Sequence, residues 1–315
     1  MSTKVKQVAI LGGRGYVGSE IIKILNNHEH FYLAKVFSSS AAGTLVDIYS
    51  KDKSLKYEQL NKNIDLSNID FVILALPNNA SEPYINLIDN KYKKITIIDI
   101  SSDNRFNKNW FYSIPELSKM NSNVSTRISN PGCYASAMQF SILPIKSMIK
   151  GKIHSFGISG YSGAGASPNK RNNLKNLENN IIPYNINGHS HEKEVSFHCY
   201  QDISFTPNVA SFFRGILMTS HFSLKEKVPI DDLIELYEEF YKDFPLVQIT
   251  KDIPMIQDTI NKHITKLGGF SLDASGKTLK VCCTLDNLLK GAATQVIQNL
   301  NISLGINNTT GITYE

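Results

Sequence analysis

The sequence has no long hydrophobic run, few cysteines and no concentration of positive charge. Its longest apolar run covers residues 71–77, whereas a membrane-spanning helix needs about 20 residues, so no membrane partner is expected. The four cysteines, of which only Cys282 and Cys283 are close together, match neither a disulfide framework nor a zinc-binding spacing. The net charge is +5 and the lysines are scattered, which disfavours a nucleic-acid partner. These absences favour a globular protein with a small-molecule ligand, in a reducing compartment.

The composition is that of an ordered globular chain, with 42% apolar and 19% charged residues, and 315 residues are enough for two domains. Residues 1–6 lead directly into an apolar strand, without the features of a targeting segment, so a cytoplasmic location is expected. Residues 172–187 are rich in asparagine. We interpret this enrichment as a compositional bias of the source genome in a loop.

A glycine-rich turn joins the first predicted strand, residues 7–11, to a helix that begins near Ser19. The turn has the G-x-G-x-x-G pattern in the strand–turn–helix context of dinucleotide-binding folds. Glycines permit the tight turn and let backbone N–H groups approach a pyrophosphate at the helix N-terminus. The alternative is a turn without a ligand. The candidate cofactor-binding residues are Gly13, Arg14, Gly15, Tyr16, Val17 and Gly18.

The second predicted strand, residues 32–37, ends where an acidic residue would bind the ribose 2′-hydroxyl of NAD. Serines occupy positions 38–40 instead. Because no carboxylate repels a 2′-phosphate and hydroxyl groups can bind one, Ser38 and Ser39 favour NADP as the cofactor. The alternative is a serine-rich loop that binds nothing.

Strands and helices alternate through the first part of the chain, with strands predicted over residues 71–76 and 95–100 and a helix over 81–90. The predicted fold class is therefore α/β, with a Rossmann-type, doubly wound parallel sheet. Pro77 follows one strand at its carboxyl end, where such sheets place ligand-binding loops. Asp99 and Asp103, at the end of the next strand, are interpreted as capping and turn residues.

Cys133 is the candidate nucleophile. It follows the dipeptide Pro131-Gly132 and lies in the first turn of a predicted helix, which Pro144 interrupts. Backbone N–H groups and the helix dipole at this position lower the pKa of a thiol and make the thiolate available near neutral pH. The alternative is a small buried core residue, since unmodified cysteine is among the most buried residue types.

Two further segments carry candidate chemistry. Residues 159–165 form a loop of small residues, interpreted as a place of close approach, with a flexible linker as the alternative. His189 and His191 would face the same side of a strand, but no third metal ligand is evident, so no metal is predicted. One imidazole suits a general acid or base, because its pKa lies near working pH. Glu194 can orient an imidazole or bind substrate.

Arg214 lies between aromatic residues and a strand-like run, where a guanidinium suits two-point binding of a carboxylate or phosphate. The alternative is a surface arginine at a strand end. An amphipathic helix is predicted over residues 230–241 and a strand over 279–284. Asn287 precedes a last helix whose small residues suit packing against the sheet or against a nicotinamide.

Six segments together resemble a known family: residues 13–18, 130–135, 159–165, 189–194, 214–217 and 286–293. They are similar to N-acetyl-γ-glutamyl-phosphate reductases, enzymes of arginine biosynthesis, over nearly the whole chain. The resemblance implies an NADP-binding Rossmann domain over residues 1–132, completed by a C-terminal helix within 288–315. It also implies an α+β catalytic and oligomerisation domain of the semialdehyde dehydrogenase type over 133–287, in a homodimer or homotetramer. The motifs are closest to the fungal, mitochondrial branch.

The chain departs from the family pattern at three places. Serines stand where the family commonly has an arginine after the second strand, which weakens the implied 2′-phosphate contact. Lys193 replaces a proline and Ser136 replaces a threonine, and neither residue is asked to perform chemistry.

The resemblance implies that Cys133 attacks an acyl phosphate and forms a thioester, which NADPH reduces to a semialdehyde. His191, or else His189, acts as acid and base, and Arg214 and Glu194 hold the substrate. Further implied site residues are Asn130 and His189 for the substrate, and Ser159, Gly160, Ser162, Gly163 and Asn287 near the nicotinamide. The alternatives are a sister reductase for an aminoadipate-type or aspartyl phosphate, and an NADP-binding sensor without turnover.

Overall fold

The computed structural model describes residues 5–46, 49–118 and 125–314. The chain divides into two compact units, one made of residues 1–131 and 292–313 and the other of residues 132–291 and 314–315. Residues 1–4, which belong to the segment expected to carry no targeting signal, lie outside the described residues. No helix of the described ranges is both long and apolar enough to cross a membrane.

The first unit is built on a parallel sheet of seven strands in the order β3-β2-β1-β4-β5-β7-β6. Its strands are β1 (Lys6–Leu11), β2 (Phe31–Ser38), β3 (Tyr57–Gln59), β4 (Phe71–Leu74), β5 (Thr96–Asp99), β6 (Phe111–Tyr112) and β7 (Arg127–Ser129). Its helices are α1 (Tyr16–Leu25), α2 (Glu82–Lys91) and α7 (Thr294–Ser303). The predicted α/β class with a doubly wound parallel sheet is thereby confirmed.

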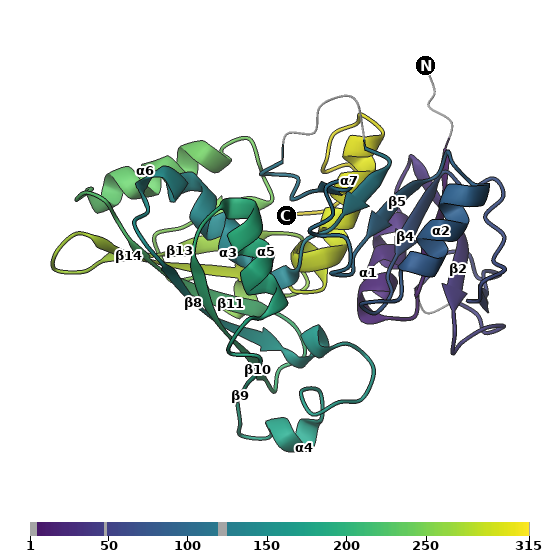
Figure 1. Cartoon of the computed structure of the whole chain (residues 1–315), viewed down its shortest axis with the longest axis horizontal. Coiled ribbons are helices and arrows are strands. Elements are labelled where there is room, and N and C mark those ends of the chain that lie inside the picture. Colours follow the sequence, from purple (N-terminus) through teal and green to yellow (C-terminus); the bar gives the residue numbers. More distant parts are fainter. Residues whose placement is uncertain (1–4, 47–48, 119–124, 315) are drawn as a thin grey trace. The chain divides into compact units, whose positions relative to one another are not determined.

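The central strands β1 and β4 are apolar at almost every position, because a parallel sheet covered by helices buries both of its faces. Figure 1 shows α7, in yellow, beside the purple α1, against which it packs. Residues 294–301 of α7 are all buried although five of the eight are polar. The two asparagine amides have partners: Asn299 accepts from Ser113 Oγ at 2.6 Å, and Asn301 Oδ1 lies 2.9 Å from His28 Nε2. A buried polar helix face of this kind is stable only because its groups have partners.

The second unit contains a mixed sheet of seven strands in the order β12-β13-β14-β11-β8-β10-β9. Its strands are β8 (Ile153–Gly160), β9 (Ile182–Pro183), β10 (Ile203–Ala210), β11 (Ile216–Ser223), β12 (Val247–Ile249), β13 (Thr265–Leu272) and β14 (Thr278–Leu285). Its α-helices are α3 (Cys133–Ile142), α4 (Leu174–Leu177), α5 (Ser190–Cys199) and α6 (Ile230–Tyr241). Short 3-10 helices η1 (Leu143–Met148), η2 (Tyr161–Ala164) and η3 (Ile256–Asp258), and a π-helix η4 (Leu289–Ala293), complete the elements.

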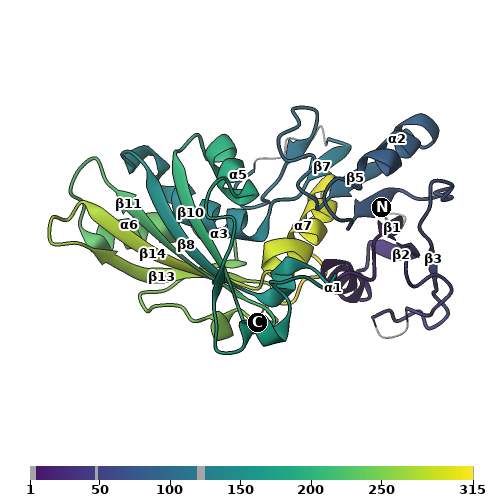
Figure 2. The same cartoon turned by 60° about the horizontal axis from the view of Figure 1, so that its bottom comes forward.

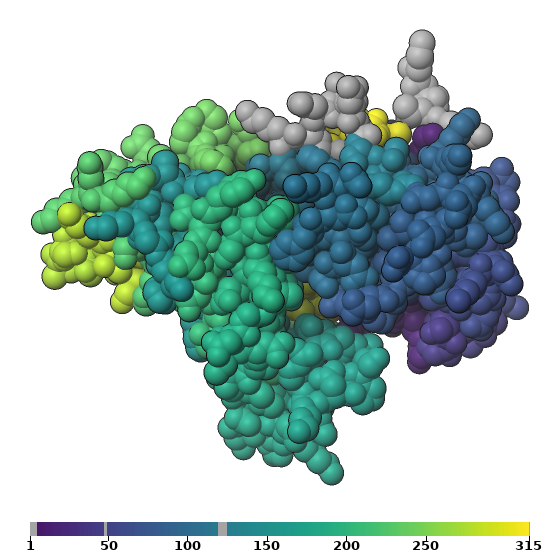
Figure 3. All heavy atoms as spheres, viewed as in Figure 1, coloured from purple at the N-terminus to yellow at the C-terminus, as the bar shows by residue number. Residues whose placement is uncertain are grey.

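Helix α3 packs on the β11, β13 and β14 strands and beside α5, and Figure 2 shows these elements together. Every residue of α3 after Cys133 is buried, which explains why apolar residues lie on all sides of the helix. The opposite face of the sheet is more open: along β8 the side chains alternate between buried and exposed, and Phe156 is 47% exposed. In Figure 3 the teal segment that contains α4 stands out from the rest of this unit.

Candidate functional site

The glycine turn begins α1 in the first unit. A Cβ on Gly13 would lie 2.2 Å from Val36 Cγ1, and one on Gly18 would lie 2.8 Å from the Cα of Gly13, so both positions require glycine for packing. At Gly15, the residue that caps α1, the nearest atom to such a Cβ is Gly12 O at 3.5 Å. The turn is therefore closed toward β2 and α1 and open at the helix N-terminus, which is the shape a pyrophosphate cradle needs.

Arg14 and the end of β2 meet beside this turn. Arg14 Nη1 donates to Ser40 Oγ at 3.0 Å in an exposed contact, and Ser38 Oγ accepts from the Ser40 backbone N–H at 3.3 Å. Ser38 is buried, whereas Ser39 is exposed. Arg14 belongs to the glycine turn and the serines follow β2, and the fold brings Arg14 and Ser40 together at one edge of the sheet. A guanidinium and a hydroxyl at this edge can bind a phosphate.

The carboxyl ends of the neighbouring strands β4 and β5 form tight turns. Pro77 is exposed after β4, and the Asn79 backbone N–H donates to both carboxylate oxygens of Asp103, at 2.8 and 2.9 Å. Asp99 is fully buried and accepts from Ser101 and other donors. These contacts confirm the interpretation of Asp99 and Asp103 as capping and turn residues.

Cys133 is the first residue of α3, as predicted, and Gly132 is its N-cap in an extended conformation. Cys133 is half-buried, and a Cβ on Gly291 of the π-helix η4 would lie 2.9 Å from the Cys133 Cβ. Gly291 therefore leaves just enough room for the cysteine. All four cysteines lie within the described residues, and none of them forms a disulfide. A thiol at a helix N-terminus is the environment in which the thiolate form is favoured.

Glu194 of α5 is 1% exposed and accepts from the Gly132 backbone N–H through Oε1 at 2.9 Å. This contact joins α5 to the residue that precedes Cys133. Asn130, in the first unit, is fully buried, and its Oδ1 accepts from Asn299 Nδ2 at 3.2 Å. Its backbone carbonyl accepts from Arg105 Nε at 3.0 Å, a support that the motif alone did not reveal.

His189 and His191 lie at the start of helix α5 and not on a strand, so the strand geometry considered for a metal pair is wrong. His189 is the N-cap, and its Nδ1 accepts from the His191 backbone N–H at 3.1 Å. Burial, and secondarily the charge of Arg171, lower the pKa of His189 to about 4. His189 is therefore neutral at pH 7. Among the described residues no cluster of potential ligands could hold a metal ion.

Aromatic rings surround the two histidines. The ring centroids of His189 and His191 are 4.8 Å apart, and that of Tyr134, the residue after Cys133, lies 6.1 Å from His191. Tyr134 is buried and its hydroxyl donates to the Asn208 carbonyl at 2.6 Å, which fixes the ring. The fold of the second unit thus brings the α5 histidines to the start of the cysteine helix.

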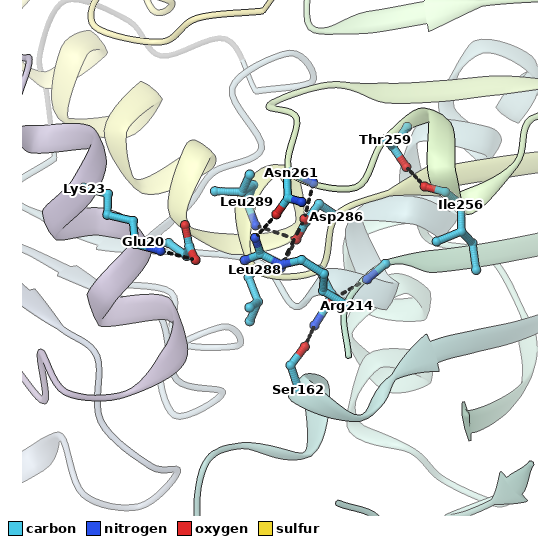
Figure 4. A network of polar contacts seen from close by, with 12 residues as sticks. Glu20, Lys23, Ser162, Arg214, Ile256, Thr259, Asn261, Asp286, Leu288 and Leu289 are labelled. Carbon is cyan, nitrogen blue, oxygen red and sulfur yellow. Dashed lines mark hydrogen bonds and ion pairs between the residues drawn. The ribbon is translucent and has the colours of Figure 1, made fainter. Parts of the chain in front are cut away.

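Arg214 forms an ion pair with Asp286, with 3.2 Å between Nε and Oδ2, and also donates to the Asn261 side chain (Figure 4). Asp286 is fully buried; burial raises its pKa, and Arg214 acts in the opposite direction. The positive charge of Arg214 is therefore already balanced by a carboxylate of this chain, a partner that the sequence motif did not indicate.

The small-residue loop after β8 packs against the chain around Arg214. Gly160 donates its N–H to the Gly215 carbonyl at 2.9 Å, and a Cβ on Gly160 would lie 2.5 Å from Phe213 O. The Asn287 amide donates to Ser162 Oγ at 2.9 Å and accepts from the Gly215 N–H at 2.8 Å. The close approach predicted for this loop therefore exists, and at Gly160 it is made by the protein's own backbone. The two other predicted residues of the loop differ in exposure: Ser159 is buried, whereas Gly163 is exposed.

Arg171 and Tyr184 were not among the predicted site residues. The guanidinium carbon of Arg171 lies 4.6 Å from the Tyr184 ring centroid, and the Tyr184 ring lies 5.5 Å from that of His189. In the sequence, Arg171 stands out only as a cation at the edge of an asparagine-rich segment. That signal is too weak to identify it as a site residue.

Family models match both parts of the chain. A semialdehyde dehydrogenase NAD-binding domain matches residues 7–124, and a semialdehyde dehydrogenase dimerisation domain matches residues 133–287. The first unit is therefore a domain of the type that binds pyridine nucleotides, and the second is of a type that mediates subunit association.

Curated relatives match over nearly the full chain. An N-acetyl-gamma-glutamyl-phosphate reductase of Xanthomonas euvesicatoria is 41% identical over 310 residues, which cover 97% of this chain and 98% of that protein. Protein arg11, mitochondrial, of Schizosaccharomyces pombe is 40% identical over 317 residues, which cover 99% of this chain and 36% of that protein. The chain thus spans about a third of the length of that fungal relative. A crystal structure of aspartate semialdehyde dehydrogenase II from Vibrio cholerae has the same fold, with a TM-score of 0.80 at 17% identity over 96% of this chain and 99% of that one.

Proposed function

The chain belongs to the family of N-acetyl-γ-glutamyl-phosphate reductases, and we propose that it reduces N-acetyl-γ-glutamyl phosphate to N-acetylglutamate semialdehyde and phosphate in arginine biosynthesis. The observation that carries the proposal is Cys133 at the N-terminus of α3, next to the histidines that begin α5. A thiolate nucleophile and an imidazole are the two groups that acyl transfer through a thioester requires.

Cys133 thiolate attacks the γ-acyl carbon, the bond from that carbon to the phosphate oxygen breaks, and inorganic phosphate leaves. The resulting thioester accepts a hydride, which bound NADPH supplies. The tetrahedral oxyanion then collapses to the aldehyde and returns the thiolate. The backbone N–H of Cys133, in the first turn of α3, is the proposed donor to this oxyanion. Glu194 has a supporting role, because its carboxylate holds the backbone immediately before Cys133.

His191 is the proposed acid and base. His189 already uses Nδ1 as the cap of α5, and its pKa of about 4 keeps it neutral at working pH, so it is a poor proton donor. An effective acid and base has a pKa near the operating pH. In this proposal His189 holds the first turn of α5 and thereby positions His191.

NADP is the proposed cofactor. The support is the guanidinium of Arg14 at Ser40, next to the end of β2 where an acidic residue would select NAD. The family commonly has an arginine after the second strand, and this chain has serines there instead. In this proposal Arg14 supplies the missing positive charge. Ser38 shapes the turn, and Ser39 is exposed beside it. Residues 13–18 hold the pyrophosphate in this proposal.

We further propose a homo-oligomer, a dimer or tetramer, that works in the cytoplasm. The open face of the second sheet, with Phe156 half exposed on β8, supports subunit association. Four cysteines outside disulfides suit a reducing compartment.

Three measurements test the function. The first measures the reverse reaction, with phosphate and NADP, for N-acetylglutamate semialdehyde, aspartate semialdehyde and the aminoadipate analogue. We expect kcat/KM to be highest for N-acetylglutamate semialdehyde. A higher kcat/KM for either of the other two would overturn the substrate assignment.

In single turnover without NADPH, the wild type should release a stoichiometric burst of phosphate and Cys133→Ser none, so a burst from the variant refutes the covalent route. His191→Asn should lower kcat by about two to four orders of magnitude, and a smaller effect than that of His189→Asn would move the role to His189.

A further inference from the structure

Arg171 lies in the segment between η2 and α5, on the side of the second unit that carries the histidines. Its guanidinium carbon is 4.6 Å from the centroid of the Tyr184 ring, and Tyr184 contacts the His189 ring at 5.5 Å. His189 in turn lies 4.8 Å from the His191 ring. A continuous series of ring contacts therefore connects Arg171 to the histidine that we propose as acid and base.

The charge of Arg171 reaches the same groups. It contributes to the lowered pKa of His189, after burial. Burial and then the charge of the Cys133 thiolate raise the pKa of the Tyr184 hydroxyl, and Arg171 acts in the opposite direction. Tyr184 is thus within electrostatic range of both Cys133 and Arg171.

The loop that carries Arg171 is fixed by asparagine side chains. Asn169 Oδ1 accepts from the Arg171 backbone N–H at 2.9 Å, and Asn169 Nδ2 donates to the Ala164 carbonyl at 3.1 Å. Asn172 Nδ2 donates to the carbonyls of Gly165 and Ser167, each at 2.8 Å. These bonds hold the backbone of Arg171 in place before any ligand arrives, which lowers the entropy cost of binding.

No carboxylate within the described part of the chain balances the charge of Arg171. Across the described ranges, no Asp or Glu lies within ion-pair distance of its guanidinium, whereas Arg214 is paired with the buried Asp286. A guanidinium that is half-buried, stacked on a tyrosine and unmatched by a carboxylate is suited to bind an external oxyanion by two parallel hydrogen bonds.

We propose that Arg171 is a substrate-binding residue whose guanidinium, held on the face of Tyr184, binds an oxyanion of the acyl phosphate. This inference rests on the proposed function, which gives the substrate two oxyanions, the phosphoryl group and the α-carboxylate. The same guanidinium chemistry fits either of them, and the kinetic arms below identify which one it binds.

The test compares Arg171→Ala, Arg171→Lys and the neighbouring control Lys170→Ala in the full-length protein. In the reverse reaction, Arg171→Ala should raise the KM for phosphate or the KM for N-acetylglutamate semialdehyde by about 10- to 100-fold, with a much smaller change in kcat. A rise for phosphate assigns the phosphoryl group, and a rise for the semialdehyde assigns the carboxylate. Arg171→Lys should recover part of the loss, and millimolar guanidinium should partly rescue Arg171→Ala. Lys170 is exposed and only its backbone carbonyl is used, by Asn176, so Lys170→Ala should resemble the wild type.

Ligand binding without turnover separates this inference from the function itself. Orthophosphate and N-acetylglutamate are each titrated while the thermal unfolding midpoint is followed. At least one of them should raise the midpoint of the wild type and of Lys170→Ala but not that of Arg171→Ala. If the wild type reduces no acyl phosphate, the proposed function fails, and this titration still decides on Arg171. Both KM values within twofold of wild type, or an equal midpoint response in Arg171→Ala, would overturn the inference.

Discussion

Acidification should destabilise the second unit through His189, the buried N-cap of α5. His189 is 7% exposed, and its pKa of about 4 lies below the ordinary value of 6.5. Well above pH 6.5 the imidazole is neutral in both the folded and the unfolded chain, so the stabilisation is complete. As the pH falls from 6.5 to about 4, the unfolded chain binds a proton that the folded chain excludes, and the free energy of unfolding decreases. The two pKa values are about 2.5 pH units apart, at about 1.4 kcal/mol per pH unit, so the full loss is about 3 kcal/mol.

The variant that isolates this effect is His189→Asn, because asparagine caps a helix through its side-chain oxygen but does not titrate. Urea unfolding at pH 7.0, 6.0 and 5.0 gives the free energy of unfolding of each protein. The wild type should lose about 2 kcal/mol more than His189→Asn between pH 7 and pH 5. His154→Gln, on the exposed face of β8, controls for the removal of an imidazole elsewhere in the same unit. Identical slopes for the wild type and His189→Asn would refute the assignment of a neutral, buried His189.

Two further substitutions probe the proposed nucleophile and the proposed cofactor. Gly291→Ala places a methyl group 2.9 Å from the Cys133 Cβ and should displace the thiol, so the phosphate burst should slow at least about tenfold while the dissociation constant of NADP, followed by fluorescence, stays within about twofold. An unchanged burst would show that the π-helix yields without moving Cys133. Arg14→Ala should reduce the preference for NADP over NAD by about 10- to 100-fold in kcat/KM, because the 2′-phosphate loses a charge-assisted hydrogen bond. Equal losses for both cofactors would mean that Arg14 only shapes the turn.

The glycine turn and the cysteine helix are predictable from the sequence because their causes are local. A strand, three spaced glycines and a helix fit one backbone geometry, and a Pro-Gly dipeptide before an apolar segment marks the start of a helix. The predicted strands over residues 71–76 and 95–100 accordingly appear as β4 and β5; β4 ends two residues earlier than predicted, and β5 is one residue shorter at each end. Helix α6 begins and ends at the predicted residues, since its amphipathic pattern is clear.

The two histidines were predicted on a strand but lie on a helix, because a side-chain hydrogen bond determines the backbone conformation there. Alternation of residues 189 and 191 is compatible with a strand, but the imidazole of His189 accepts from a backbone N–H two residues on and thereby starts a helix. The pattern of apolar and polar residues in the sequence does not indicate such a hydrogen bond.

The asparagine-rich segment was interpreted as a compositional habit, and its side chains prove to be structural. The side chains of Asn172 and of Asn169, which lies just before this segment, bind five backbone carbonyl and N–H groups of their own loop, and Asn173 caps α4. The importance of Arg171 follows only from its contact with Tyr184, which is 13 residues away along the chain and was not itself in any motif. Likewise the partner of Arg214 is Asp286, and such long-range pairs are set by strand order, which this sequence alone does not specify.

The position of helix α7 near the end of the chain affects how the first unit folds during translation. The sheet of the first unit is complete by residue 131, but α7 belongs to the same unit and is separated from it by residues 132–291. At translation rates of about 5–20 residues per second, roughly ten to thirty seconds pass before α7 is made. During that interval Ser113, Asn130 and His28 lack the amide partners that α7 provides. Until the end of the chain is made, the sheet of the first unit therefore exposes a partly polar surface, and a chaperone that covers this surface would act on the protein before its second unit is finished.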